Sequence, residues 1–249
     1  MEPKAIILGG YGFNADAELA EAFSLAGARP ERLHVADLAA DPDRLSGARI
    51  LAFPGGFSFG DHLGSGQVLA LLCRRTLRPA LEGFIAEGGL VIGICNGFQA
   101  LVRMGILPNR SGAWGREVSL IRNESGRFVD GWYPLSFEKG SRCVWTRGLE
   151  PRLLPVRHGE GRFVARDAAT LDELEREGLV AAKYAAANPN GSERAIAGIC
   201  DPSGQVLGLM PHPEQFLIRE IHPERRRSSR DETGVELFVN GVRAARDAS

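Results

Sequence analysis

The sequence has almost no excess of charge of either sign, which narrows the classes of partner that it can bind. Its 249 residues carry 30 lysines and arginines against 31 aspartates and glutamates. Proteins that bind nucleic acid or anionic membranes through electrostatic attraction carry a basic surplus. No run of about 18 apolar residues is present, and the N-terminus lacks the apolar core of a signal peptide. We therefore expect a cytoplasmic protein that binds neither nucleic acid nor membrane.

Closely spaced cysteine pairs and phosphate-binding loops are also missing. The four cysteines stand far apart, at Cys73, Cys95, Cys143 and Cys200. Zinc sites and secreted disulfide scaffolds instead bring cysteines together at short, repeated spacings. The sequence contains no Gly-x-x-x-x-Gly-Lys-[Ser/Thr] loop that could hold the phosphates of ATP. We therefore expect neither a metal site nor an ATP site in this chain.

The stretch 89–102 has the pattern of a buried strand that turns sharply into a helix. An apolar, β-branched run precedes Cys95, and apolar residues at helical spacing follow it. Gly93 and Gly97 flank the cysteine, as a turn too tight for Cβ atoms requires. This is the nucleophile-elbow pattern with cysteine in place of serine, and a helix N-terminus favours the reactive thiolate. The alternative is a buried structural cysteine between two packing glycines.

Short strands and helices alternate along the chain, which predicts an α/β protein. We expect one domain over residues 1–249, built on a doubly wound, mostly parallel sheet. Strands are predicted at 5–8, 32–36, 49–53, 179–184, 195–200 and 206–210, and the last two should form a hairpin. Helices are predicted at 17–26, 69–87 and 171–177, and Pro79 should kink or divide the second of them. Residues 109–150, which hold all three tryptophans, are predicted to form an antiparallel β extension, and residues 217–232 and 233–246 a charged loop and a C-terminal helix.

Two glycine-rich loops follow predicted strands. Residues 54–60 contain a Pro-Gly-Gly turn, which exposes backbone N–H groups that can stabilise an oxyanion or bind an anion. Residues 10–15 fit the Gly-x-Gly-x-x-Ala pattern, and Asp37 lies about where the acid of a dinucleotide site would stand. The second loop therefore indicates either a dinucleotide-binding oxidoreductase or a plain glycine-rich crossover.

A His-Pro-Glu string occurs twice, at 212–214 and at 222–224. Side chains two residues apart in an extended segment point to the same side, so the acid can orient the imidazole. The first copy directly follows a predicted strand, where a rigid sheet can position it. The second copy lies in a highly charged stretch at 219–232 with no strand before it. We expect the first copy to complete a Cys-His-Glu triad with Cys95.

These motifs occur together, and in this order, in one known family. The chain resembles the triad-type (class I) glutamine amidotransferases in Phe-Pro-Gly-Gly-Phe-Ser-Phe-Gly-Asp at 53–61, Gly-Ile-Cys-Asn-Gly-Phe-Gln at 93–99, His-Gly-Glu-Gly at 158–161, Asn-Pro-Asn-Gly-Ser at 188–192 and Met-Pro-His-Pro-Glu at 210–214. The first, third and fourth strings point more narrowly to the glutaminase subunits of a purine-biosynthetic synthase. The resemblance implies a flavodoxin-like sheet.

The resemblance also implies a role for individual residues. It makes Cys95 the nucleophile, His212 the general base and acid, and Glu214 the group that orients His212. The implied oxyanion hole consists of the backbone N–H groups of Gly56 and Asn96, and the implied glutamine pocket is lined by Gln99, His158, Gly159 and Glu160. The chain departs from the family pattern at Gln215, in a short segment before Asn188, and at Gly9-Gly10.

The implied reaction is hydrolysis of L-glutamine, with transfer of the ammonia to a separate synthetase subunit. By the resemblance, that subunit binds ATP and magnesium, this chain needs no cofactor of its own, and a small third subunit can bridge the two. Three alternatives stay open at this point. They are a stand-alone γ-glutamyl hydrolase on the same fold, the dinucleotide-binding oxidoreductase, and a non-catalytic regulatory subunit.

Overall fold

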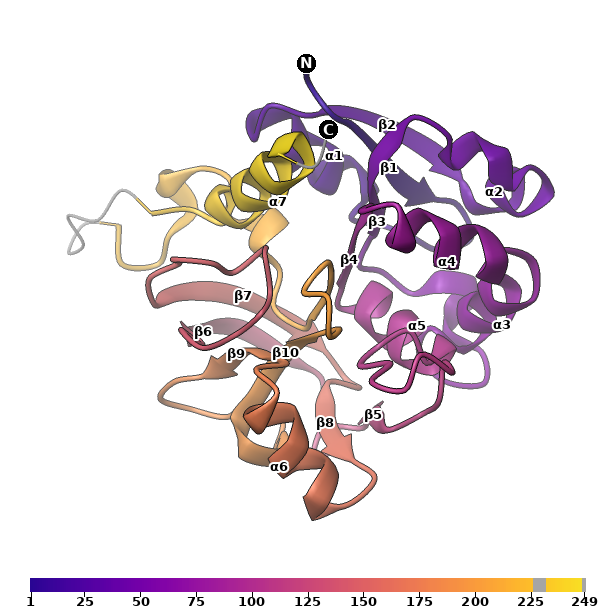
Figure 1. Ribbon diagram of the computed structural model, residues 1–249. Coiled ribbons are helices and arrows are strands. Elements are labelled where there is room, and N and C mark those ends of the chain that lie inside the picture. Colours follow the sequence, from indigo (N-terminus) through magenta and orange to yellow (C-terminus); the bar gives the residue numbers. More distant parts are fainter. Residues whose placement is uncertain (226–231, 248–249) are drawn as a thin grey trace.

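A nine-stranded sheet runs through the molecule and carries helices on both faces (Figure 1). The computed structural model describes residues 1–225 and 232–247. The strand order is β2-β1-β3-β4-β11-β10-β9-β6-β7. The bounds of these strands are β1 Lys4–Gly9, β2 Arg29–His34, β3 Ala48–Phe53, β4 Leu90–Ile94, β6 Val129–Phe137, β7 Arg152–His158, β9 Val180–Tyr184, β10 Ile196–Cys200 and β11 Val206–Leu209.

Five neighbouring strands form the parallel half of this sheet. They are β2, β1, β3, β4 and β11, and each pairs in parallel with the next. Four of these, β1, β3, β4 and β11, are short apolar runs buried along nearly their whole length, as strands covered by helices on both faces must be. Their order along the chain is that of the flavodoxin-like doubly wound sheet. The α/β class predicted from the sequence is therefore confirmed.

The other four strands, β10, β9, β6 and β7, pair antiparallel. Strand β6 falls in the region 109–150 that was expected to form an extension, yet it lies inside the central sheet between β9 and β7. A two-stranded ribbon is only marginally stable alone, and β6 gains partners on both edges in this position. Strand β5 (Val118–Ile121) instead pairs with β8 (Arg162–Ala165) in a small separate sheet.

Helices lie in two layers around the parallel half of the sheet, whereas α6 packs beside β8. Figure 1 shows α1 and α7 on one face and α3, α4 and α5 on the other. Their bounds are α1 Asp16–Leu25, α2 Val35–Ala40, α3 Gln67–Thr76, α4 Arg78–Ala86, α5 Asn96–Met104, α6 Ala168–Arg176 and α7 Val235–Asp247. Within the described residues, every helix is too short or too polar to span a bilayer.

Local signals explain most element boundaries. The predicted helix 69–87 is divided into α3 and α4, because Pro79 begins a new helix where its missing N–H removes no hydrogen bond. The predicted strand 32–36 ends earlier, at His34, whose Nδ1 accepts the Ala36 amide at 3.1 Å and caps α2. Of the charged loop, residues 226–231 lie outside the described residues.

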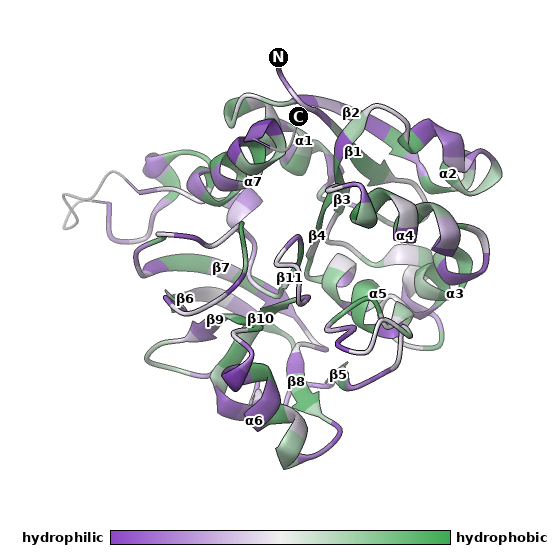
Figure 2. Ribbon diagram, in the orientation of Figure 1, coloured by the Kyte–Doolittle hydropathy of each residue, from purple (hydrophilic) through white to green (hydrophobic). Residues whose placement is uncertain are grey.

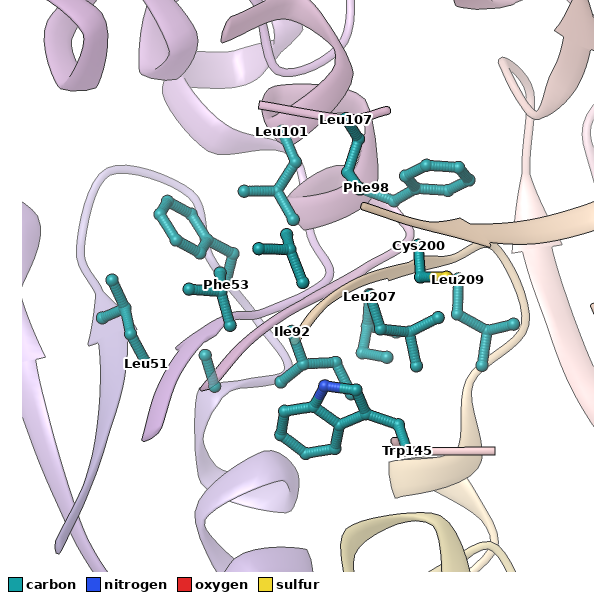
Figure 3. Packing of buried hydrophobic residues seen from close by; sticks show 14 of the residues in the cluster. Leu51, Phe53, Ile92, Phe98, Leu101, Leu107, Trp145, Cys200, Leu207 and Leu209 are labelled. Carbon is teal, nitrogen blue, oxygen red and sulfur yellow. The ribbon is translucent and has the colours of Figure 1, made fainter. Parts of the chain in front are cut away.

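Hydrophobic residues gather along the central strands (Figure 2), and their buried side chains form one continuous core. Figure 3 shows Phe98 and Leu101 of α5 on one side of the strands and Trp145 on the other. Gly208 leaves room for Phe98, since a Cβ there would lie 1.9 Å from the phenyl ring. Trp114 and Trp145 are both buried. This core holds β4 and β11 rigidly side by side.

Candidate active site

Cys95 lies on a sharp turn between β4 and α5. Its backbone has φ 49° and ψ −102°, a conformation rare for residues other than glycine and typical of strained functional turns. The flanking glycines cannot be replaced without collisions. A Cβ on Gly97 would lie 2.0 Å from the Phe53 carbonyl oxygen, and one on Gly93 would lie 2.7 Å from the Gly97 carbonyl carbon. The tight elbow expected from the sequence is therefore present.

His212 follows β11, which pairs with β4 from Val206 opposite Val91 to Leu209 opposite Ile94. Because the two strands are parallel neighbours, the residues that follow them emerge at the same edge of the sheet. His212 Nδ1 lies 2.7 Å from Glu214 Oε1, and both side chains are buried. The His212 amide also donates to the Pro155 carbonyl of β7 at 2.8 Å. The histidine is thus fixed by backbone and side chain together.

The charge state of His212 depends on its neighbours. Burial lowers its pKa, but the Glu214 carboxylate and the Cys95 sulfur outweigh burial and raise the pKa to about 10. An imidazole with this pKa is protonated at neutral pH and can balance a thiolate. Within the described residues, His212 Nε2 and Glu214 Oε2 are buried without a hydrogen-bond partner. The Nε2 atom is therefore free to exchange a proton with a bound substrate.

The second His-Pro-Glu copy has a different environment. His222 Nδ1 accepts the backbone amide of Glu224 at 3.0 Å. The His222 ring packs against Trp132 and Phe216, with centroids 5.8 and 5.5 Å apart. His212 lines the cavity beside Cys95, and His222 is not among the lining residues. The structure thus brings the first copy, and not the second, to the cysteine.

Two backbone N–H groups flank Cys95 without acceptors in the described part of the chain. Gly56 lies after β3 with φ +142°, and a Cβ there would meet the Gly12 carbonyl oxygen at 2.8 Å. Its amide donates no hydrogen bond within the described residues. Asn96 is the first residue of α5, where an amide has no intrahelical acceptor. Both groups are available to a developing negative charge.

The glycine-rich loop at 10–15 supports the loop of Gly56. Phe13 forms an isolated antiparallel bridge with Gly56, and the Phe57 amide donates to the Gly12 carbonyl at 3.0 Å. A Cβ on Gly12 would lie 2.3 Å from the Phe57 carbonyl oxygen. Asp37 lies inside α2, in an ion pair with Arg44. The glycines therefore permit two loops to approach closely, which removes the basis for the dinucleotide alternative.

A cavity of about 340 Å³ opens beside Cys95. Its walls bring together residues from distant parts of the chain, including Gly56, Gln99, His158, Gly159, Glu160 and His212. Asp61, Phe128, Arg157 and Gln215 also line it and were not predicted to do so. Within the described residues, no three histidine, cysteine, aspartate or glutamate side chains are grouped to hold a metal ion.

His158 is held by two asparagines to which the sequence analysis assigned no role. Its Nδ1 lies 3.1 Å from Asn123 Oδ1, and its Nε2 lies 3.4 Å from Asn190 Nδ2. Burial and the charge of His212 lower the pKa of His158 to about 4, so the ring is neutral at pH 7. A Cβ on Gly161 would overlap this ring. The strings at 158–161 and 188–192 therefore meet in one buried network.

Gln99 joins helix α5 to the turn at 158–161. Its Nε2 donates to the Glu160 carbonyl oxygen, and its Oε1 accepts from Asn96 Nδ2 at 3.0 Å. These two bonds hold the turn against the helix.

The two asparagines beside His158 differ in what the sequence shows of them. Asn123 belongs to no motif, so no local pattern marks it. Asn190 belongs to a string that was noticed but carried no predicted role.

A doubly wound sheet that presents a cysteine elbow beside a buried histidine–glutamate pair characterises the triad-type glutamine amidotransferases, and this chain is an enzyme of that class. Residues 2–243 match the family described as the CobB/CobQ-like glutamine amidotransferase domain.

Comparison with individual proteins narrows the family. The chain is 42% identical to the phosphoribosylformylglycinamidine synthase subunit PurQ of Dehalococcoides mccartyi, over 98% of both chains. It is 37% identical to PurQ of Treponema denticola, over 97% of this chain and 98% of that one. A chain in the structure of PurLQS from Thermotoga maritima superposes with a TM-score of 0.76 at 30% identity, over 98% of this chain and 99% of that chain. The chain belongs to the PurQ family of phosphoribosylformylglycinamidine synthase subunits.

Proposed function

We propose that this chain hydrolyses L-glutamine and supplies ammonia as the glutaminase subunit of phosphoribosylformylglycinamidine synthase. One observation carries the proposal. His212, whose Nδ1 lies 2.7 Å from Glu214 Oε1, follows the strand that pairs with β4, and it lines the same cavity as Cys95. The names of the relatives support the choice of synthase.

In the first half of the reaction, the Cys95 thiolate attacks the side-chain amide carbon of glutamine. The carbonyl oxygen becomes an oxyanion and accepts hydrogen bonds from the Gly56 and Asn96 amides. His212 donates its Nε2 proton to the departing nitrogen, so ammonia leaves and a γ-glutamyl thioester remains. Glu214 holds the Nδ1 proton throughout and keeps the ring oriented.

In the second half, water replaces ammonia. Neutral His212 takes a proton from the water through Nε2, and the hydroxide attacks the thioester carbon. The same two amides stabilise the second oxyanion. When the tetrahedral intermediate collapses, the Cys95 thiolate leaves and glutamate is released. The thiolate and the imidazolium are then restored together.

The remaining components of the proposal lie outside this chain. A synthetase subunit binds ATP and magnesium and uses the ammonia to convert formylglycinamide ribonucleotide to formylglycinamidine ribonucleotide. A small subunit bridges the two, and the assembly works in the cytoplasm. The similarity to a chain of the PurLQS structure supports a multi-subunit assembly.

Replacement of the nucleophile tests the proposal. Cys95→Ala should abolish glutamine-dependent synthesis by the assembled complex, whereas ammonium salt should still support synthesis. Cys73→Ala is the matched control, because Cys73 is also buried but lies in α3 and does not line the cavity. Glutamine hydrolysis by Cys95→Ala at the wild-type rate would refute the assignment.

A further inference from the structure

The side chain of Asn96 connects the elbow to the loop that carries Gly56. Asn96 is fully buried. Its Oδ1 accepts the Ser58 amide at 3.1 Å, and its Nδ2 donates to Asp61 Oδ1 at 2.9 Å. Ser58 and Asp61 both belong to the segment 54–66, which we call the oxyanion loop. One side chain therefore fixes this loop at two points just beyond Gly56.

The oxyanion loop needs an anchor because its backbone conformation is unfavourable. Phe59, Asp61 and Leu63 have φ of 55°, 52° and 65°. Side chains other than glycine crowd the backbone in this left-handed region. Such conformations persist only when surrounding contacts impose them. On the upstream side the bridge between Phe13 and Gly56 restrains the loop. On the downstream side the contacts with Asn96 do so.

The Asp61 carboxylate is already engaged by protein groups. Besides Asn96, its Oδ1 accepts the Gly66 amide at 3.4 Å, and its Oδ2 accepts the Ser65 hydroxyl at 3.0 Å. Asp61 thus closes the loop on itself and on the elbow at the same time. Although it lines the cavity, its hydrogen-bonding capacity is directed at the loop.

We infer that Asp61 and the Asn96 side chain are positioning residues that hold the Gly56 amide where the oxyanion forms. This inference rests on the proposed function, since an oxyanion develops only if Cys95 attacks the glutamine amide. It assigns the string at 53–61 a purpose that the Pro-Gly-Gly turn alone does not explain. The Pro-Gly-Gly turn supplies the Gly56 amide as the donor, and Asp61 keeps the oxyanion loop that carries this amide in place.

The test compares a reaction that forms an oxyanion with one that does not, using the full chain in complex with its synthetase partner. In Asp61→Ala, the kcat for glutamine hydrolysis should fall by about 100-fold, the size expected for a displaced catalytic donor, while KM stays near the wild-type value. Alkylation of Cys95 by iodoacetamide occurs at a saturated carbon without an oxyanion, so its rate should be unchanged.

Three further variants sharpen the comparison. Asp61→Asn keeps an oxygen that can accept from Asn96 and should restore kcat to within a few-fold. Asn96→Asp keeps the backbone amide but places a second carboxylate against that of Asp61. The two negative charges repel each other, so this variant should reproduce the loss of kcat. Asp201→Ala is the control, because Asp201 similarly accepts from Ser203 and Val206 in a turn at the opposite end of β11 from His212. It should leave both rates unchanged.

The outcomes separate this inference from the proposed function. An unchanged kcat in Asp61→Ala, a rise in KM alone, or a parallel fall in hydrolysis and alkylation would each overturn the positioning role. A rise in KM alone would instead make Asp61 a ligand of the substrate. If the wild-type complex formed no acyl-enzyme at Cys95, the proposed function would fail and this inference with it.

Discussion

Two buried histidines line the same cavity, and their pKa values are shifted in opposite directions. His158 contacts the amides of Asn123 and Asn190, and burial together with the charge of His212 lowers its pKa to about 4. His212 is also buried, but Glu214 and Cys95 raise its pKa to about 10. The carboxylate therefore decides which imidazole carries the proton, and only His212 can act as an acid at neutral pH.

The neutral state of His158 should make the folded protein less stable in acid. Its pKa falls from 6.5 to about 4 on folding, so between these values the unfolded chain binds more protons. The contribution of neutral His158 to the free energy of unfolding is roughly 3 kcal/mol. It is fully present above pH 6.5 and is lost as the pH falls from there through 4. Urea titrations at a series of pH values should show a shallower acid-side decline in His158→Gln than in wild type.

The control for this prediction is His62→Gln, since His62 is exposed and its replacement should leave the wild-type decline intact. Identical acid-side slopes in His158→Gln and wild type would contradict the assignment of a neutral, buried His158.

The two His-Pro-Glu copies should respond differently to substitution. His212→Ala should lower glutaminase turnover by several orders of magnitude, because members of a catalytic triad act as a unit. His222→Ala should preserve turnover, but it removes a ring packed against Trp132 and Phe216 and should cost about 2 kcal/mol of stability. Steady-state kinetics and thermal unfolding of both variants measure this. Comparable kinetic losses would mean that the second copy also takes part in catalysis.

At the scale of the elements, two helical glycines form a matched pair with opposite predicted effects. Gly83 lies on the exposed side of α4, where an added Cβ meets nothing within 4 Å. Gly83→Ala should therefore raise stability by about 0.5–1 kcal/mol. Gly241 in α7 lies under Trp145, whose ring would be 2.1 Å from an added Cβ. Gly241→Ala should lower stability by about 1–2 kcal/mol, since overpacking exceeds the gain in helix propensity.

Denaturant midpoints of the two glycine variants provide the measurement. Both substitutions make the same chemical change in a helix, so their difference isolates the contact between α7 and Trp145. Stabilisation by Gly241→Ala would show that this helix packs differently on the sheet.

The elements that could be predicted from the sequence are those whose boundaries are set by residues close to them in the chain. The strand before Cys95, the break at Pro79 and the hairpin between β10 and β11 all follow from residues adjacent in the chain. The place of β6 in the central sheet does not, because β6 pairs with β9, and β7, β8 and α6 lie between these two strands in the chain. Neighbouring strands of a sheet need not be neighbours in sequence.

The candidate site divides in the same way. Cys95 and His212 stand in strings whose chemistry is visible in the sequence, whereas Asn123 is a single polar residue that gains meaning only from its contact with His158. The loop at 10–15 shows the converse. Its glycines fit a nucleotide-binding pattern, but the close approach that they permit is to Gly56 of the same chain.

At the scale of the whole molecule, we expect the isolated chain to be a poor glutaminase. Phe57 and Leu63 of the oxyanion loop are 51% and 83% exposed, so a partner has apolar surface through which to add to the restraints that Asn96 and Asp61 place on that loop. Adding the synthetase subunit with its nucleotide and substrate should raise glutamine turnover by about 5- to 150-fold, the usual range of coupling between sites. Steady-state turnover with and without these components measures the effect.

Equal turnover in the two conditions would contradict control by assembly. It would favour the stand-alone γ-glutamyl hydrolase and would leave the roles of Cys95, His212 and Glu214 unchanged.

The pairing of β4 with β11 also determines when the protein can first react during its synthesis. More than a hundred residues separate Cys95 from His212, so at about 5–20 residues per second the elbow leaves the ribosome roughly ten seconds before its base. Until β11 arrives, one edge of β4 has no partner, and such an edge invites pairing with other chains. The strand that delivers the base is therefore also the one that closes this vulnerable edge, and no unfinished chain consumes glutamine.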